Sequence, residues 1–148
     1  MTPVPEASVE ASEALHRRVR AFARASAGGQ GGGGGAGSGR VGSGDGSSSD
    51  GSDDTFDRLA CDIARFQAER QPRLLRLYRR AGLDPAGLRF AHEVPAVPSD
   101  VFKLARIAVH PAALDARVFR TSGTTSGGRG EHPFRTTATY DELALAFG

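Results

Sequence analysis

The chain has 148 residues with 20 glycines and a single cysteine, which excludes a disulfide framework and a zinc site built from thiolates. No apolar run approaches the about 18 residues of a membrane span, and the N-terminus lacks the apolar core of a secretory signal, so we predict a cytoplasmic protein with no membrane partner. The formal net charge of +2 is small and its basic residues are scattered, which excludes a nucleic-acid groove.

The first segment, residues 1–27, is predicted to form an amphipathic helix. From Ser12 to Ala25 the apolar residues recur at helical spacing, and Ser12 is the expected N-cap; these residues are Leu15, Val19 and Phe22. A basic helix on a membrane surface and a helix packed on the following domain both fit the pattern. We favour packing, because three modest apolar residues beside three glutamates make a poor anchor.

Residues 28–54 contain 13 glycines and 6 serines. Such a composition cannot bury enough apolar surface to offset its ordering entropy, so we predict a disordered linker or loop insertion. An RNA-binding tract of the arginine–glycine type is disfavoured, because the segment has one arginine and no aromatic residue for base stacking.

Two helices are predicted after the tract. The first covers Phe56–Arg70, capped by Asp54 or Thr55, with one apolar face made by Phe56, Leu59, Ala60, Ile63 and Phe66. Cys61 lies beside that face and is interpreted as a small helix residue rather than a nucleophile. The second covers Arg73–Ala81, with Pro72 in its first turn and Gly82 just past its end; its core contacts are Leu74, Leu75, Leu77 and Tyr78.

The remaining chain mixes strands and helices, so the predicted fold class is α/β. Val94–Pro98 is expected to be extended because of its two prolines, and Ser99 is expected to cap a short helix through Phe102 and Leu104. Strands are predicted at Arg106–Val109, Arg117–Arg120 and Glu131–Thr136. A last helix is predicted to begin near Tyr140, capped by Thr137 or Thr139.

The segment Thr121–Gly130, with the sequence TSGTTSGGRG, carries the chemical signal. Glycines let backbone N–H groups turn toward an anion, hydroxyls add donors, and an arginine balances phosphate charge. The residues alone leave a phosphate-binding loop and a flexible polar turn equally open. Neither the Walker A pattern nor the Gly-x-Ser-x-Gly elbow of hydrolases is present.

This segment resembles the nucleotide-phosphate loop of adenylate-forming enzymes, which read Thr/Ser-Ser-Gly-Thr-Thr-Gly-x-Pro-Lys-Gly. Two departures stand out: Ser126 replaces a glycine, and Gly128-Arg129 replaces proline-lysine. With the upstream stretches FQAERQPRLLRLYRRAGLDP and EVPAVPSDVFK, residues 55–148 resemble the acyl-protein synthetase family. That family includes the fatty-acid activating component of bacterial luminescence systems and is related to phenylacetate–CoA ligases.

The resemblance implies a fold in which N-terminal helices precede the start of an adenylate-forming N-terminal domain, incomplete here, with residues 55–148 as its partial adenylation domain. It implies that a carboxylic acid, possibly fatty, is activated with ATP and Mg²⁺ to an acyl-adenylate and passed to a thiol or protein acceptor. The residues expected to bind the ATP phosphates are Thr121, Ser122, Gly123, Thr124, Thr125, Gly127 and Arg129. No catalytic residue and no metal ligand is assigned.

The adenine pocket, the acyl pocket, the later carboxylate ligands and the acyl-accepting cysteine of such enzymes would lie beyond Gly148. The chain is therefore expected to be the N-terminal part of a truncated or split reading frame and inactive alone. His132 follows the loop and is interpreted as a surface histidine or as a substrate contact. A different class stays open: a non-catalytic helical interaction module with a disordered linker and no ATP contact. The 121–130 loop distinguishes the two.

Overall fold

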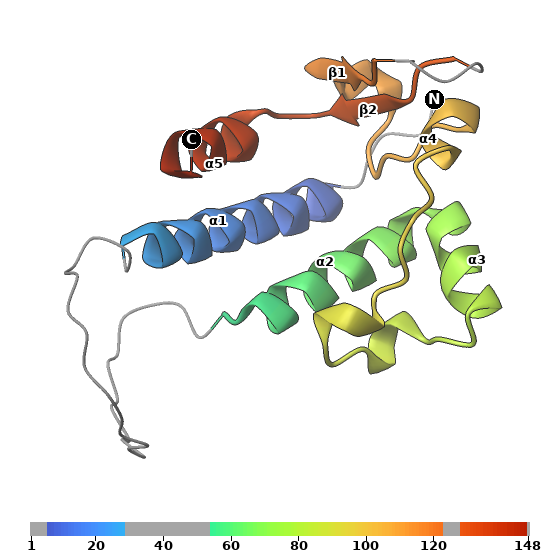
Figure 1. Ribbon diagram of the computed structural model, residues 1–148, viewed down its shortest axis with the longest axis horizontal. Helices are drawn as coiled ribbons and strands as arrows, with labels where there is room; N and C mark the ends of the chain where they lie inside the picture. The colour runs from blue at the N-terminus through green and yellow to red at the C-terminus, as the bar shows by residue number, and fades with distance from the viewer. Residues whose placement is uncertain (1–5, 29–53, 123–127, 148) are drawn as a thin grey trace.

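The computed structural model describes residues 6–28, 54–122 and 128–147. Within these ranges the protein is a mixed α/β structure that is mostly helical, with five α-helices and one two-stranded antiparallel sheet (Figure 1). Most of the predicted tract at 28–54 lies outside the described residues. No helix of the described ranges is long and apolar enough to cross a membrane.

Helix α1 extends over Glu6–Gly28, so it begins well before the expected cap at Ser12. The prediction of Ser12 as N-cap is therefore wrong, and this serine lies inside the helix. The residues upstream of it are mainly glutamate and alanine, which favour helix, and Glu6 stands in the first turn, where a negative charge complements the helix dipole.

Helix α2, Phe56–Arg70, has the predicted bounds. The prediction of Thr55 as a cap is confirmed, because its side-chain hydroxyl accepts the Arg58 N–H at 3.2 Å. Asp54 serves a different purpose: its carboxylate accepts two hydrogen bonds from Arg18 of α1, one of them at 2.8 Å from Nε. This pair joins α1 to the start of α2.

The predicted apolar face of α2 is wrong in part. Phe56 is 66% exposed, whereas Cys61 is 1% exposed and lies at the centre of the core. That core cluster comprises Cys61, Ala64, Ala68, Tyr78 and Leu88. The small residues of α2 let neighbouring elements approach this helix closely. Burial also raises the pKa of the Cys61 thiol. A raised pKa lowers the fraction of reactive thiolate, so Cys61 has a packing role rather than a nucleophilic one.

Helix α3 covers Pro72–Arg80, one residue to the N-terminal side of the prediction. Its end is confirmed: Gly82 adopts φ +69°, its N–H bonds to Arg79, and the Leu83 N–H bonds to the Tyr78 carbonyl at 3.0 Å. This is the Schellman arrangement, for which glycine is the favoured residue. The turn directs Leu83 onto the core cluster.

Gln71 occupies the corner between α2 and α3. Its N–H bonds to the Gln67 carbonyl and ends α2, while its side-chain oxygen stands at the N-cap of α3 and accepts from Arg73. Its side-chain nitrogen donates to the Ala108 carbonyl at 3.1 Å. One residue therefore ends one helix, begins the next and binds a third segment.

Short 3-10 helices at Pro85–Gly87, Ala91–Glu93 and Ala112–Leu114 link the larger elements. Helix α4 covers Val101–Leu104, which confirms the predicted short helix. Ser99 is not its cap, because Asp100 occupies that position without a side-chain bond.

The predicted strand at Arg106–Val109 is wrong. The sheet of the described residues contains only β1 and β2. The carbonyls of this segment are instead bound by side chains of the α2–α3 corner: Arg106 by Arg73, and Ala108 by Gln71. Side-chain donors thus replace the backbone partners that a strand would need.

Strand β1, Arg117–Arg120, pairs antiparallel with β2, Glu131–Phe134, and Arg117 lies opposite Phe134. Strand β2 is shorter than predicted. Helix α5, Ala138–Phe147, follows and lies along α1 (Figure 1). It begins before Tyr140, and Thr139 is not its cap: its buried hydroxyl lies 2.8 Å from His16 Nδ1 and accepts from Arg20.

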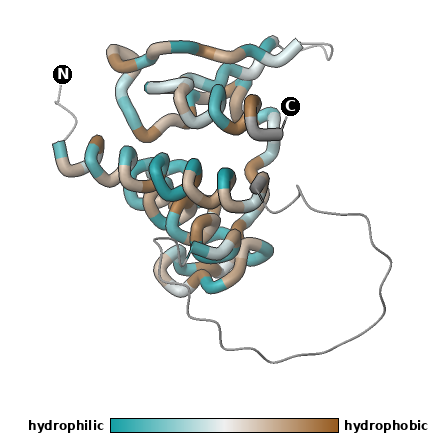
Figure 2. Tube along the Cα trace, turned by 90° about the vertical axis from the view of Figure 1, so that its left-hand side faces the viewer, coloured by the Kyte–Doolittle hydropathy of each residue, from teal (hydrophilic) through white to brown (hydrophobic). Residues whose placement is uncertain are grey.

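Teal and brown segments alternate along the tube in Figure 2, which shows that hydrophilic and hydrophobic residues are interspersed along the helices. Ion pairs accompany this packing between α1 and α5, where Arg20 and Arg24 both contact Glu142. The fold thus places β1, β2 and α5 on one side of α1, with α2 and α3 on the other.

Candidate functional site

The Thr121–Gly130 segment joins the two strands, and its base is held by a closed pair of hydrogen bonds. The Thr121 N–H donates to the Gly130 carbonyl at 3.0 Å, and the Gly130 N–H donates to the Thr121 hydroxyl at 2.9 Å. Arg120 and Glu131, opposite each other in the register, add an ion pair at 3.0 Å. The loop therefore starts and ends at a fixed separation.

Gly130 is buried and lies against α4. A Cβ at this position would stand 3.4 Å from Cβ of Phe102 and from Cγ2 of Thr121, closer than most side-chain contacts. The Phe102 ring also contacts the His132 ring, with centroids 4.3 Å apart. Close packing thus fixes the base of the loop to α4.

The sequence-predicted phosphate ligands divide into two groups. Thr121, Ser122 and Arg129 are described, and all three are exposed. The others, Gly123, Thr124, Thr125 and Gly127, lie outside the described residues. Gly128 adopts φ +94°, a conformation that favours glycine. The structure therefore brings Thr121 and Arg129 to the two sides of one hairpin base.

A pocket of about 280 Å³ opens at the foot of the loop. It takes three basic residues from three different segments: Lys103 of α4, Arg106 and Arg129. Sequence analysis missed the first two. Lys103 is the only lysine of the chain, and this is the one feature of the sequence that could have marked it as a candidate site residue.

Two of these three cations have carboxylate partners. Lys103 lies 2.9 Å from Asp100, and Arg106 makes two bonds to Asp115, at 2.7 and 2.8 Å. The guanidinium of Arg106 holds the pKa of the Asp115 carboxyl below its usual range. Arg129 has no ion-pair partner among the described residues. Of the three cations, Arg129 is therefore the one that no carboxylate in the described ranges holds.

The described residues contain no group of three His, Cys, Asp or Glu side chains that could hold a metal ion. His132 is half-buried, and its ring packs against the Phe102 ring. The pocket offers hydrogen-bond donors and positive charge together with the carboxylates of Asp115 and Glu131, which pair with Arg106 and Arg120.

Comparison of the chain with models of protein families, with curated proteins and with solved structures found no match.

Proposed function

We propose that this chain carries the ATP-phosphate loop of an ATP-dependent ligase that activates a carboxylic acid as an acyl-adenylate and passes the acyl group to a thiol or protein. The observation that supports this most is the loop base. Thr121 and Gly130 close the base of a ten-residue segment of small hydroxyl residues and glycines. Arg129, which has no ion-pair partner among the described residues, lines the pocket beside that base.

The phosphate chemistry follows from the donor types. Backbone N–H groups of a glycine-rich loop form a concave nest for anions, and hydroxyls of Ser122 and the neighbouring threonines add donors. Donors that are already positioned stabilise the charge that develops on the pyrophosphate leaving group. Arg129 supplies a positive charge that has no ion-pair partner within the described residues. Mg²⁺ would bind the phosphate oxygens, which are ligands of the kind that it prefers.

The finer fold assignment belongs to the same proposal. A helical N-terminal region followed by a hairpin that bears the loop is what the resemblance to acyl-protein synthetases implies for the start of an adenylate-forming domain. On this proposal Thr121, Ser122, Gly123, Thr124, Thr125, Gly127 and Arg129 surround the phosphates, in a cytoplasmic enzyme.

The test is a calorimetric titration of the chain with Mg²⁺–ATP and with AMP, which lacks the outer phosphates. We expect ATP to bind more tightly than AMP. Arg129→Ala should weaken ATP binding about tenfold or more, because a hydrogen bond to a charged group contributes about 1.5–3 kcal/mol. Arg117→Ala is the matched control, since it removes the same charge at the far end of the hairpin.

A double variant, Thr124→Ala with Thr125→Ala, tests the hydroxyl donors. It should weaken ATP binding and leave thermal melting nearly unchanged. If ATP does not bind, or binds equally to Arg129→Ala, to the double Thr variant and to the unmodified chain, the loop is a polar turn. The alternative of a helical interaction module without nucleotide binding then holds.

A further inference from the structure

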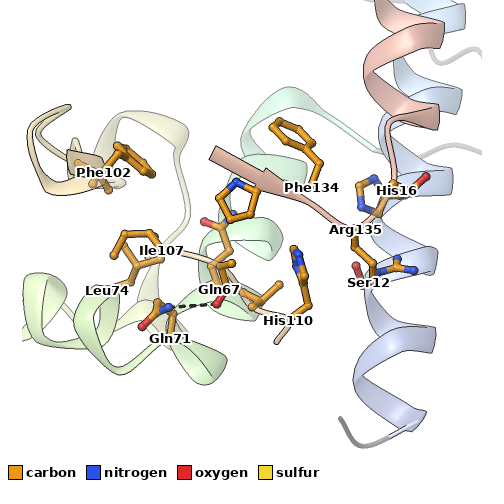
Figure 3. A pocket seen from close by; sticks show the side chains of 15 residues that line it. Ser12, His16, Gln67, Gln71, Leu74, Phe102, Ile107, His110, Phe134 and Arg135 are labelled. Atoms are coloured by element: carbon orange, nitrogen blue, oxygen red, sulfur yellow. Dashed lines mark hydrogen bonds between the residues drawn. The ribbon is translucent and has the colours of Figure 1, made fainter. Parts of the chain in front are cut away.

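A second cavity, of about 260 Å³, lies among α1, the α2–α3 corner, the 97–110 segment and β2 (Figure 3). Its two walls differ in chemistry. One wall is mostly apolar, with Leu74, Phe102, Ile107 and Phe134, and it also carries the amides of Gln67 and Gln71 beside Leu74 and Ile107. The other wall is polar and includes Ser12, His16, His110 and Arg135. Concave sites with mostly apolar lining and a few polar groups are typical of small-molecule binding.

Arg135 supplies the positive charge of the polar wall. Its side chain is 20% exposed and donates through one terminal nitrogen to Glu13 of α1. A guanidinium has five N–H donors, so most of its donors have no partner among the described residues. Every fully buried side-chain nitrogen or oxygen in the described part of the chain has a partner. The unused N–H groups of Arg135 are therefore open to the cavity or to water.

Two imidazoles flank this guanidinium. His16 Nδ1 lies 2.8 Å from the Thr139 hydroxyl, and His110 Nε2 lies 2.9 Å from Asp115. Each ring thus keeps one nitrogen that has no partner among the described residues. Burial lowers the pKa of both histidines, and Arg135 contributes to both shifts. An anion beside Arg135 would oppose these shifts and favour the protonated rings.

We propose that this cavity binds a small monocarboxylic acid, with its carboxylate on Arg135 between the two histidines and its apolar body against Leu74, Ile107 and Phe134. An inorganic anion would leave the apolar wall in contact with water, and a neutral or cationic ligand would leave Arg135 without an acceptor. A compact molecule with one anionic end and one apolar end satisfies both walls. That this acid is the ligase substrate rests on the function proposed above, and it departs from the expectation that the acyl pocket lies beyond Gly148.

The volume sets a scale for the part of the acid that the cavity surrounds. A water molecule occupies about 30 Å³ of liquid, and a carbon with its hydrogens takes similar space. A volume of 260 Å³ is therefore that of about nine non-hydrogen atoms, which is about the size of benzoate or hexanoate. The cavity is open to solvent on one side, so the chain of a longer acid can extend out of it.

Glu13 gives the proposal a sharp test, because it competes with the ligand for Arg135. Arg135→Gln and Glu13→Gln both break the same ion pair. If the pair were only structural, both variants would change ligand binding in the same direction. If Arg135 binds the carboxylate, Arg135→Gln weakens binding and Glu13→Gln strengthens it.

The experiment is a calorimetric titration of the chain with benzoate in the absence of ATP, with benzamide as the neutral isostere. We expect benzoate to bind and benzamide to bind at least tenfold more weakly. Arg135→Gln should weaken benzoate binding about ten- to a hundredfold, as expected for a charge-assisted hydrogen bond, and Glu13→Gln should tighten it several-fold. Ala108→Leu should fill the cavity and abolish binding, whereas Ala113→Leu, at an exposed site outside it, should not.

Equal binding of benzoate and benzamide, or shifts of the same sign in the two ion-pair variants, would overturn the proposal. The result is separable from the ATP titration. Loss of ATP binding with benzoate binding retained refutes only the phosphate loop, and the reverse refutes only this cavity.

Discussion

The hydroxyl of Thr121 is the contact on which the geometry of the loop base depends most directly. Thr121→Val removes it and keeps the size and the β-branch of the side chain. The Gly130 N–H, which donates to that hydroxyl at 2.9 Å, then loses its partner. Gly130 is buried against Phe102, so water has little access to the freed donor. An unsatisfied buried donor costs about 1–3 kcal/mol.

This cost has two measurable forms. The free energy of unfolding, obtained by urea denaturation, should fall by up to about 1–3 kcal/mol when the hairpin unfolds together with the rest of the chain. When the hairpin opens locally, the amide hydrogen of Gly130 should exchange about 5- to 150-fold faster, the ratio that corresponds to the same free energy. Thr121→Ser is the matched control, because it keeps the hydroxyl.

Hydrogen exchange followed by NMR measures the protection of the Gly130 amide directly. Slow exchange in the unmodified chain and in Thr121→Ser, with fast exchange in Thr121→Val, is the expected pattern. If the valine variant matches the unmodified chain in both amide exchange and stability, the Thr121 hydroxyl does not hold the loop base, and the positional argument for the phosphate site loses its support.

Three further predictions concern stability. Leu88→Ala should cost about 2–5 kcal/mol in urea denaturation, because Leu88 is 3% exposed within the core cluster, whereas Leu104→Ala, at 86% exposure, should change stability by less than about 0.5 kcal/mol. Gly82→Ala should lower the melting temperature and cost about 1–2 kcal/mol, since φ is +69° there; an unchanged melting temperature would contradict the Schellman end of α3. Arg18 lowers the pKa of Asp54, so the pair stabilises the fold above the ordinary carboxyl pKa of about 4, and this contribution disappears as pH falls through the lowered value. Asp54→Asn should therefore flatten the acid side of the stability–pH curve, and a curve of unchanged shape would refute this role.

The features that sequence predicted well are those with local causes. Thr55 caps α2, and Gly82 ends α3, because a cap is decided by residues within one turn of the helix end. The strands at Arg117–Arg120 and after Gly130 follow from strand-forming residues on either side of a glycine-rich segment, and the structure pairs them antiparallel. That the segment between them binds phosphates stays a prediction.

The features that sequence missed depend on distant partners. Cys61 is more buried than Phe56 because Tyr78 and Leu88 approach the small side of α2, and no periodicity of α2 reveals that approach. The Arg106–Val109 segment has strand-forming residues but lacks a strand to pair with among the described residues. His16, His110 and Arg135, from three parts of the chain, meet at one cavity only after folding.

The corner residue Gln71 has a mechanical consequence. Its backbone sets the bend between two helices, and its amide side chain grips the Ala108 carbonyl on the rim of the 260 Å³ cavity. Gln71 thus connects the angle between α2 and α3 to the position of the Ala108 carbonyl. We expect a change in this angle to move the cavity wall at Ala108, and a ligand that displaces this wall to change the angle.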